Sequence, residues 1–318
     1  MPGPDDANNA PPKRRPLRLV LSVIVPLVIV WFIARSIINN WAAINAHEWG
    51  FDPAWLALAS GLYLFVIVFL VQLWAGLLKA AAGRTPGLAR AYRISALANL
   101  GKYLPGKVWT VMGVIYLMKR DGYSAGSTFA ASILHQAFTI LAGATFALLT
   151  LGMDFWRGQQ AWPAAIGFGL CLCLIILYPP LFTRCLNWGL RLVRREPISI
   201  RLTLPRSLLL FVLYLVAWAA YGASFWCFLR GVGLENLPFW KVAAASCGAY
   251  LVGFLALFAP GGLGVREGIL AVLLAPYMGP GIPAAVAVLS RLWMTIVELV
   301  GLAPLLTPWG RQPQARND

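Results

Sequence analysis

Residues 258–269 read FAPGGLGVREGI and interrupt a long apolar run with a Pro-Gly-Gly break, directly followed by the charged pair Arg266 and Glu267. Proline lacks the amide proton that a helix requires, and glycine favours non-helical backbone, so a helix must break here. In lipid, broken backbone and charged side chains are tolerated where protein or a water-filled cavity supplies partners. We therefore predict that this stretch forms the floor of a binding site.

The composition of the whole chain is that of a polytopic membrane protein. Of the 318 residues, 60% are hydrophobic and 12% are charged, and the mean hydropathy is +0.73, which is too apolar for an ordinary soluble domain. The net charge of +15 comes from Lys and Arg residues in short loops and tails, where they orient the chain against anionic lipid headgroups. We therefore expect no nucleic-acid partner. The five cysteines lack the paired spacing of a zinc site, and we expect neither a metal nor another cofactor.

The order of apolar runs and basic loops predicts an all-α protein with about six full spans, each near the roughly 20 residues that cross a bilayer. The runs lie at residues 17–38, 55–78, 124–151, 162–182, 207–229 and 284–306. Basic residues follow the second, fourth and sixth runs, which assigns those loops to the cytoplasm. Residues 1–16 and 311–318 are then cytoplasmic tails, the first of them disordered, around a membrane domain at residues 17–310.

Two further segments are each broken in the middle by Pro-Gly. Residues 94–118 hold two short arms around Pro105, and residues 242–274 hold two arms around Pro260. An arm of about 11 residues covers about 16 Å, roughly half of a bilayer core. Basic residues flank both ends of the first segment, whereas the loop after the second has none. We therefore predict two re-entrant hairpins that enter from opposite sides, which makes eight or more membrane helices in total.

This arrangement implies an inverted internal repeat, with halves at roughly 55–151 and 207–306. An offset of 155 residues superimposes identical residues from the first hairpin turn through the following span. The superimposed pairs are Pro105 and Pro260, Gly106 and Gly261, Gly113 and Gly268, Gly126 and Gly281, Ala130 and Ala285, and Leu134 and Leu289. The same charge pattern predicts that Gly122 is cytoplasmic and that Gly279 is external.

The arginines at the second break are candidates for holding a lipid headgroup. The planar guanidinium donates bidentate hydrogen bonds to phosphate and stays charged when partly buried, so Arg266 and Arg291 are predicted to form a headgroup clamp. Glu267 either balances these arginines or binds a proton during transport. Glycines would let backbone amides and the positive end of the following half-helix approach the anion. These glycines are Gly261, Gly262 and Gly264.

Other candidates each have a structural alternative. Glu298 lies seven residues after Arg291 on the same helical face, and both either face the substrate or form an ion pair that fastens the last span to the broken stretch. Lys102 and Lys107 flank the first break and either contact the ligand or extend to the membrane surface. Gln136 corresponds to Arg291 under the offset, although interhelical hydrogen bonding is its ordinary role.

Residues 99–107, NLGKYLPGK, and residues 259–268, APGGLGVREG, followed by Arg291, resemble the lysylphosphatidylglycerol synthase transmembrane region family of flippase-like proteins. In that family the membrane region is associated with moving an aminoacylated phospholipid across the inner membrane. Stand-alone members occur beside polyprenyl-lipid, hopanoid and glycolipid pathways. The family often has an acidic or arginine pair where this chain has His135 and Gln136, so the resemblance leaves the headgroup preference open.

The resemblance implies a lipid translocator in the bacterial inner membrane, with a membrane lipid as substrate and envelope-lipid or glycolipid biosynthesis enzymes as possible partners. Members that make the lipid carry a soluble synthase domain after the membrane region, and we expect this chain to lack it because few residues follow the last span. The sequence has no Walker loop and no His-Glu-x-x-His pair, and we predict no catalytic residues. The alternatives are a membrane transferase or its accessory subunit, acting on a lipid-linked substrate, and a scaffold for such enzymes.

Overall fold

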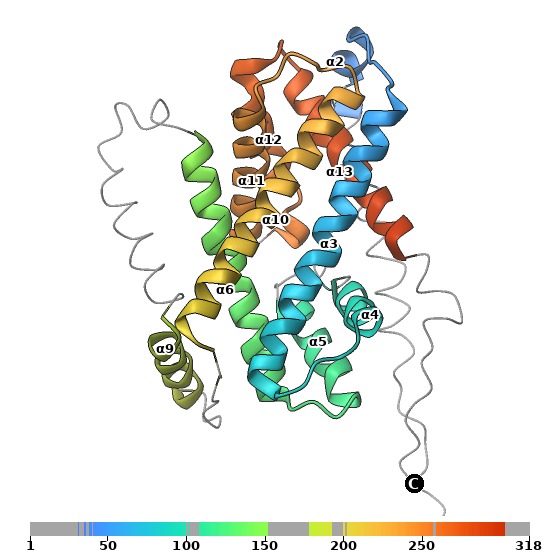
Figure 1. Cartoon of the computed structure of the whole chain (residues 1–318). Helices are drawn as coiled ribbons and strands as arrows, with labels where there is room; N and C mark the ends of the chain where they lie inside the picture. The colour runs from blue at the N-terminus through green and yellow to red at the C-terminus, as the bar shows by residue number, and fades with distance from the viewer. Residues whose placement is uncertain are drawn as a thin grey trace, which may run out of the picture.

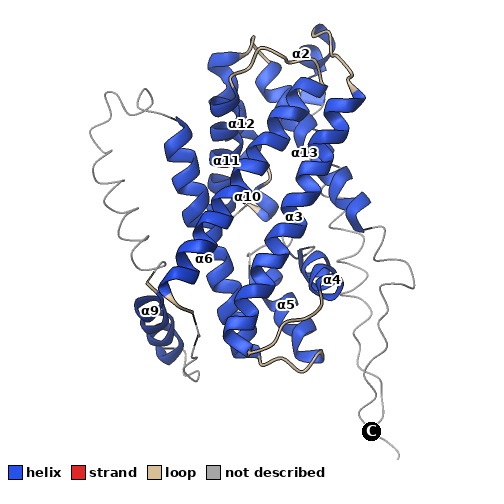
Figure 2. Ribbon diagram, viewed as in Figure 1, coloured by secondary structure: helices blue, strands red, loops and turns tan. Residues whose placement is uncertain are grey.

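The computed structural model describes residues 31, 35, 38–39, 41–99, 101, 108–151, 178–192, 200, 202–256 and 259–302. Within that part of the chain, all regular secondary structure is helical, as Figure 2 shows. This agrees with the predicted all-α class. The predicted N-terminal and C-terminal tails, the turn at Pro105, and most of the predicted spans at 17–38 and 162–182 lie outside the described residues.

Long helices form the frame of the protein (Figure 1). They are α3 (Pro53–Ala82), α6 (Ala125–Leu151), α10 (Leu204–Gly231) and α13 (Ile282–Leu302). In the described part of the chain, these four are long and apolar enough to cross a membrane. Each coincides within a few residues with a predicted span, which confirms four of the six as long apolar helices. The total of eight or more membrane helices stays a prediction.

Local signals in the sequence explain where the longest of these helices begins and ends. Asp52 caps α3, because its carboxylate Oδ1 accepts hydrogen bonds from the amides of Ala54 at 2.9 Å and Trp55 at 3.2 Å. Pro53 follows at the first helical position, where its missing amide proton costs nothing. At the other end Gly83 adopts a left-handed φ of 76° and donates its amide to the carbonyl of Lys79.

Shorter helices lie between the long ones in two pairs, α4 (Leu88–Asn99) with α5 (Val108–Arg120), and α11 (Phe239–Leu255) with α12 (Val265–Leu274). The order of one long, two short and one long helix therefore occurs twice. Adding 155 to the residue numbers of α4, α5 and α6 gives positions that overlap α11, α12 and α13. In Figure 1 the pair α4–α5 lies at the lower end of the bundle and the pair α11–α12 at the upper end. An inverted repeat would place the pairs in this way, and both the repeat and the re-entrant depth of either pair stay predictions.

The first pair begins earlier than the sequence predicted. Helix α4 starts at Leu88, six residues before the predicted arm at 94–104, so Arg90 and Arg93 lie in a helix and not in a cytoplasmic loop. The reason is that α4 is amphipathic, with buried residues at helical spacing on one face. These buried residues are Ala91, Ile94 and Ala98. The arginines occupy another face, so their charge did not end the helix.

A second correction concerns the region after the fourth predicted span. Helix α9 (Pro179–Leu192) includes the last residues of the run at 162–182 and the start of the predicted loop at 184–206. Arginines and apolar side chains alternate at helical spacing there, and this pattern is an amphipathic helix rather than a span followed by a loop. In Figure 1, α9 lies beside the lower end of α10. Short helical turns complete the described part: α2 (Trp41–Ala46), η2 (Pro260–Gly262) and η3 (Ala275–Tyr277).

Helix α10 is the centre of the fold and packs against α3, α6 and α11. Its Tyr214 ring stacks on Phe138 of α6 with centroids 5.6 Å apart, and both rings are fully buried. Its Trp218 donates the indole N–H to the carbonyl of Thr139 at 2.9 Å. Gly222 lets α11 approach closely, because a Cβ there would lie 2.7 Å from the Cβ of Ala243. The indole of Trp218 thus finds a protein partner within the bundle, as an apolar surrounding requires.

Candidate functional site

The predicted break lies between α11 and α12, with η2 at its centre. Three glycines of this stretch have left-handed backbone, with φ of 59° at Gly261, 70° at Gly262 and 81° at Gly264. Gly262 also packs directly against the end of α11, because a Cβ at this position would lie 2.9 Å from the carbonyl oxygen of Gly253. A side chain is therefore excluded at Gly262 both by its backbone conformation and by space.

Glu267 caps the N-terminus of α12. Its carboxylate Oε2 accepts a hydrogen bond of 2.7 Å from the amide of Gly264, which lies three residues earlier and precedes the helix. The amide of Gly262 donates to the carbonyl of Ala259 at 2.9 Å. The sequence predicted that these amides and the positive end of α12 would face an anionic ligand. In the structure both amides already have a protein partner: the Glu267 carboxylate accepts from Gly264, and the Ala259 carbonyl accepts from Gly262.

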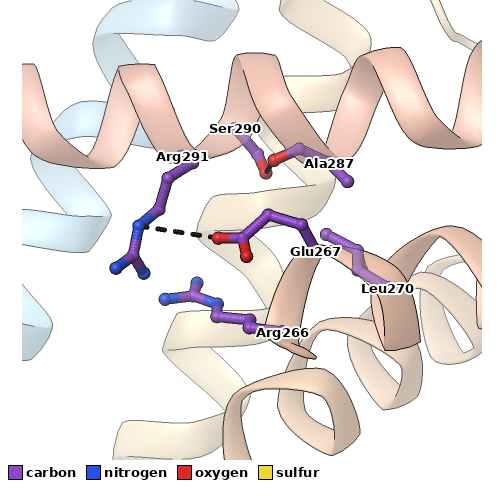
Figure 3. Close-up of a pocket in the computed structure, with 6 residues that line it drawn as sticks. All are labelled: Arg266, Glu267, Leu270, Ala287, Ser290 and Arg291. Atoms are coloured by element: carbon purple, nitrogen blue, oxygen red, sulfur yellow. Dashed lines mark hydrogen bonds and ion pairs between the residues drawn. The ribbon is translucent and has the colours of Figure 1, made fainter. Parts of the chain in front are cut away.

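The last long helix is fastened to the break by Arg291 (Figure 3). Its Nε lies 3.6 Å from Oε1 of Glu267, and its Nη2 donates to the carbonyl oxygen of Gly261 at 3.0 Å. Glu267 is 8% exposed and Arg291 is 9% exposed. At 3.6 Å the ion pair is too long for a hydrogen bond, and Oε1 has no hydrogen-bond partner. The pair thus combines two buried charges with incomplete hydrogen bonding.

Arg266 lies beside this pair in a group of aromatic side chains. Its Nη2 donates to the hydroxyl of Tyr221 on α10, and it contacts the sulfur of Met294 on α13 at 2.8 Å. Its guanidinium carbon is 5.2 Å from the ring centroid of Tyr250 on α11, within the range of cation–π attraction. The rings of Tyr221, Tyr250 and Trp218 meet edge to face with centroids 5.3 to 5.8 Å apart. Arg266 therefore joins α12 to α10, α11 and α13.

The charged residues enclose a narrow space between α12 and α13. Its lining residues are Arg266, Glu267, Leu270, Ala287, Ser290 and Arg291. The space is too small to admit a water molecule. Arg266, Glu267 and Arg291 therefore lie together, but the open cavity that the sequence predicted around them is closed in this structure.

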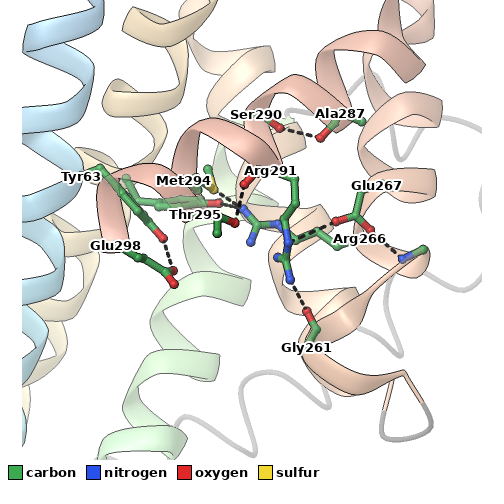
Figure 4. Close-up of polar contacts among 12 residues, drawn as sticks. Tyr63, Gly261, Arg266, Glu267, Ala287, Ser290, Arg291, Met294, Thr295 and Glu298 are labelled. Atoms are coloured by element: carbon green, nitrogen blue, oxygen red, sulfur yellow. Dashed lines mark hydrogen bonds and ion pairs between the residues drawn. The ribbon is translucent and has the colours of Figure 1, made fainter. Parts of the chain in front are cut away.

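Glu298 occupies a different part of α13. Its Oε1 accepts a hydrogen bond of 2.9 Å from the hydroxyl of Tyr63 on α3, as Figure 4 shows. The Tyr63 ring lies 5.6 Å from that of Trp293, whose indole N–H donates to the hydroxyl of Ser60 at 3.0 Å. Seven residues separate Glu298 from Arg291, which is about 10 Å along a helix. Glu298 thus fastens α13 to α3 and does not line the space beside Arg291.

The remaining predicted residues are not part of this group. Gln136 lies on α6 and does not line the space between α12 and α13. Its neighbour His135 forms an interhelical hydrogen bond through Nδ1 with the hydroxyl of Tyr214 on α10. Lys102 and Lys107 lie outside the described residues.

Sequence reasoning missed the partners of the charged residues, namely Tyr63, Tyr221, Tyr250 and Met294. A signal was present for three of them, because tyrosine within an apolar span carries a hydroxyl that needs a hydrogen-bond partner. Which charge each tyrosine would meet depends on how α3, α10 and α11 are rotated about their axes. That rotation is not encoded locally.

Comparison with known proteins identifies the family of the chain. The family model of the lysylphosphatidylglycerol synthase TM region matches residues 17–301, which is nearly the whole chain. A search of the curated proteins found no match. The extent of the family match shows that the chain belongs to the lysylphosphatidylglycerol synthase TM region family.

Proposed function

We propose that the protein is a lipid translocator of the bacterial inner membrane, which moves a phospholipid or a polyprenyl-phosphate-linked lipid between leaflets. The observation that carries this proposal is the meeting of Arg266 and Arg291 at one helix break inside a membrane protein. Ionised side chains within membrane helices are costly, by about 2.5 to 3.5 kcal/mol each on insertion scales, and commonly mark substrate paths. Two arginines at one break are well suited to the phosphate of a lipid headgroup.

The hydrogen-bonding capacity of the two guanidinium groups supports this assignment. Each guanidinium carries five N–H donors, and the contacts described engage only part of them. Arg291 donates to a carbonyl oxygen through Nη2, and Arg266 donates to a hydroxyl through Nη2. A phosphate between them would accept bidentate hydrogen bonds from both groups. It would also balance the second positive charge, since one carboxylate, Glu267, lines the space with the two arginines.

Loading of a headgroup requires the closed space to widen. Because no water molecule fits between α12 and α13, a phosphate enters when these helices separate beside the break. Arg291 would then exchange the carbonyl of Gly261 and its long contact with Glu267 for phosphate oxygens. Glu267 would keep its hydrogen bond with the amide of Gly264 and so hold the start of α12 in place. The acyl chains would stay in the surrounding lipid.

Lipid scrambling in proteoliposomes tests this proposal. We expect Arg266→Gln and Arg291→Gln each to lower the rate of fluorescent phospholipid translocation about tenfold or more, the size expected for losing a hydrogen bond to a charged group. Arg90→Gln is the matched control, because Arg90 pairs with Asp121 away from the break and we expect its rate to stay near that of the original protein.

The folded state of each variant is checked by gel filtration in the same detergent. Unchanged translocation in a folded protein carrying both Arg266→Gln and Arg291→Gln contradicts the site assignment. Mass spectrometry of the lipids after incubation with a group donor separates translocation from the alternative of a transferase. A chemically modified lipid product would favour the transferase.

A further inference from the structure

Helix α9 has two chemically different faces. Arg184, Asn187 and Arg191 are three, four and seven residues apart and therefore share one face. On the other side, Phe182 is buried in the hydrophobic core and Leu186 packs against it. The residues of α9 include no aspartate or glutamate. The helix thus lies with its apolar side against the protein and presents a polar side whose charged residues are all basic.

A surface pocket follows this basic face. It has a volume of about 220 Å³, and the described residues that line it are Thr183, Arg184, Asn187, Trp188 and Arg191. Arg184 and Arg191 are exposed and about 10 Å apart along the helix, with Asn187 between them. Trp188 is 68% exposed beside them. Tryptophan at the surface of a membrane protein typically lies at headgroup level.

The surroundings of α9 are predominantly basic. In Figure 1, α9 lies at the end of the molecule that also holds α4, α5 and the connection from α5 to α6. The last turn of α5 contains Lys119 and Arg120, and exposed Arg206 lies in the first turn of α10. By the positive-inside rule such an end faces the cytoplasm, where anionic lipids attract basic segments.

We propose that the basic face of α9 binds the phosphate headgroup of an anionic phospholipid. This lipid is held in the leaflet at the basic end and is distinct from the lipid that is translocated. Arg184 and Arg191 donate to the phosphodiester oxygens from either side of Asn187, and Trp188 lies against the glycerol backbone. A soluble phosphate compound is a poorer occupant, because the apolar side of α9 and the exposed indole place this pocket at the boundary between headgroups and acyl chains.

The test measures retained lipid on the full chain in detergent. Dioleoyl phosphatidylglycerol is titrated into the purified protein and counted by native mass spectrometry, with dioleoyl phosphatidylcholine as the zwitterionic comparison. We expect the Arg184→Gln, Arg191→Gln double variant to bind phosphatidylglycerol about tenfold more weakly or worse, because charge-assisted hydrogen bonds are lost. The matched control is Arg120→Gln, Arg206→Gln, which removes the same charge from the same end and should change the affinity less than about twofold.

Each other outcome overturns the proposal. Equal weakening in both double variants would mean that binding reflects the overall charge of this end and not a site on α9. Unchanged binding in the α9 variant, or equal retention of phosphatidylcholine, would remove the headgroup assignment. Displacement by millimolar glycerol phosphate would show a site for free anions. Translocation of a zwitterionic lipid by the α9 variant is measured in parallel, so that failure of this inference is distinguishable from failure of the proposed function.

Discussion

The two pairs of short helices occupy equivalent places in the chain but use their charges in opposite ways. At the first pair, Arg90 makes two short hydrogen bonds of 2.6 and 2.7 Å to Asp121, and the two side chains are 39% and 23% exposed. At the second pair, Glu267 of α12 lies 3.6 Å from Arg291 of the following helix α13, and both side chains are 10% exposed. The exposed pair has complete hydrogen bonds, whereas the buried pair does not.

This difference distinguishes charges that stabilise the fold from charges that are candidates for binding a ligand. Arg90 fastens the start of α4 to the connection between α5 and α6, and Arg84 supports it by donating to the carbonyl of Gly122 at 2.7 Å. The pair of Arg90 and Asp121 can hold these two segments together without being buried in the membrane. A buried ion pair with a carboxylate oxygen left without a hydrogen-bond partner stabilises a fold poorly, because its desolvation is incompletely offset. The second pair is therefore the better candidate for a site that a ligand completes.

The largest expected effect concerns the sides of the membrane that the two pairs face. Membrane-impermeant maleimide should label Ser124→Cys from the cytoplasmic side and Gly279→Cys from the external side, in a background with the five native cysteines replaced by alanine. Ser124 replaces Gly122 as the probe position because Gly122 has a left-handed φ of 76°, which a cysteine rarely adopts. Labelling of both positions from one side would break the comparison, since the pairs would not be related by inverted topology.

The next effect concerns the stability of the two ion pairs. Arg291→Met leaves the buried Glu267 without its partner and should lower the free energy of unfolding by about 3 to 5 kcal/mol. Arg90→Met removes a partly exposed pair and should cost about 1 kcal/mol or less. Unfolding in mixed micelles of increasing denaturing detergent measures both. Similar losses in the two variants would contradict the distinction between a buried and an exposed pair.

The smallest effect concerns two glycines that the 155-residue offset superimposes. A Cβ at Gly268 of α12 would meet no atom within 4 Å, so Gly268→Ala should stabilise the protein by about 0.5 to 1 kcal/mol through helix propensity. A Cβ at Gly113 of α5 would lie 3.3 Å from that of Ala98, so Gly113→Ala should gain less or be destabilising. The same unfolding assay compares them. Equal gains would show that the two pairs pack alike.

Much of the architecture could be predicted because it depends on local patterns. Uninterrupted apolar runs predicted α3, α6, α10 and α13 within a few residues. The Pro-Gly-Gly break predicted the start of α12 at Val265. The start of α4 and most of α9 were missed, because a helix with one polar face resembles a charged loop when only its mean hydropathy is considered.

The candidate site was predictable in its charges and not in their partners. Arg266, Glu267 and Arg291 do come together, as charged residues in an apolar chain must. The spacing of seven residues from Arg291 predicted that Glu298 would share its surroundings. In the structure Glu298 accepts a hydrogen bond from Tyr63 of α3 instead. Helical spacing places residues on one face of one helix, but the neighbouring helices decide which of those residues share a site.

The sequence by itself determined that the chain crosses a membrane and where its helices are interrupted. It also determined that buried charges must find protein partners. These follow from hydropathy, from the backbone chemistry of proline and glycine, and from the cost of charge in lipid. Tertiary structure alone decided that Glu267 caps α12 from within, that Tyr221 accepts a hydrogen bond from Arg266, and that the space between α12 and α13 is closed. The physical reason is that these contacts depend on the packing and rotation of helices far apart in sequence.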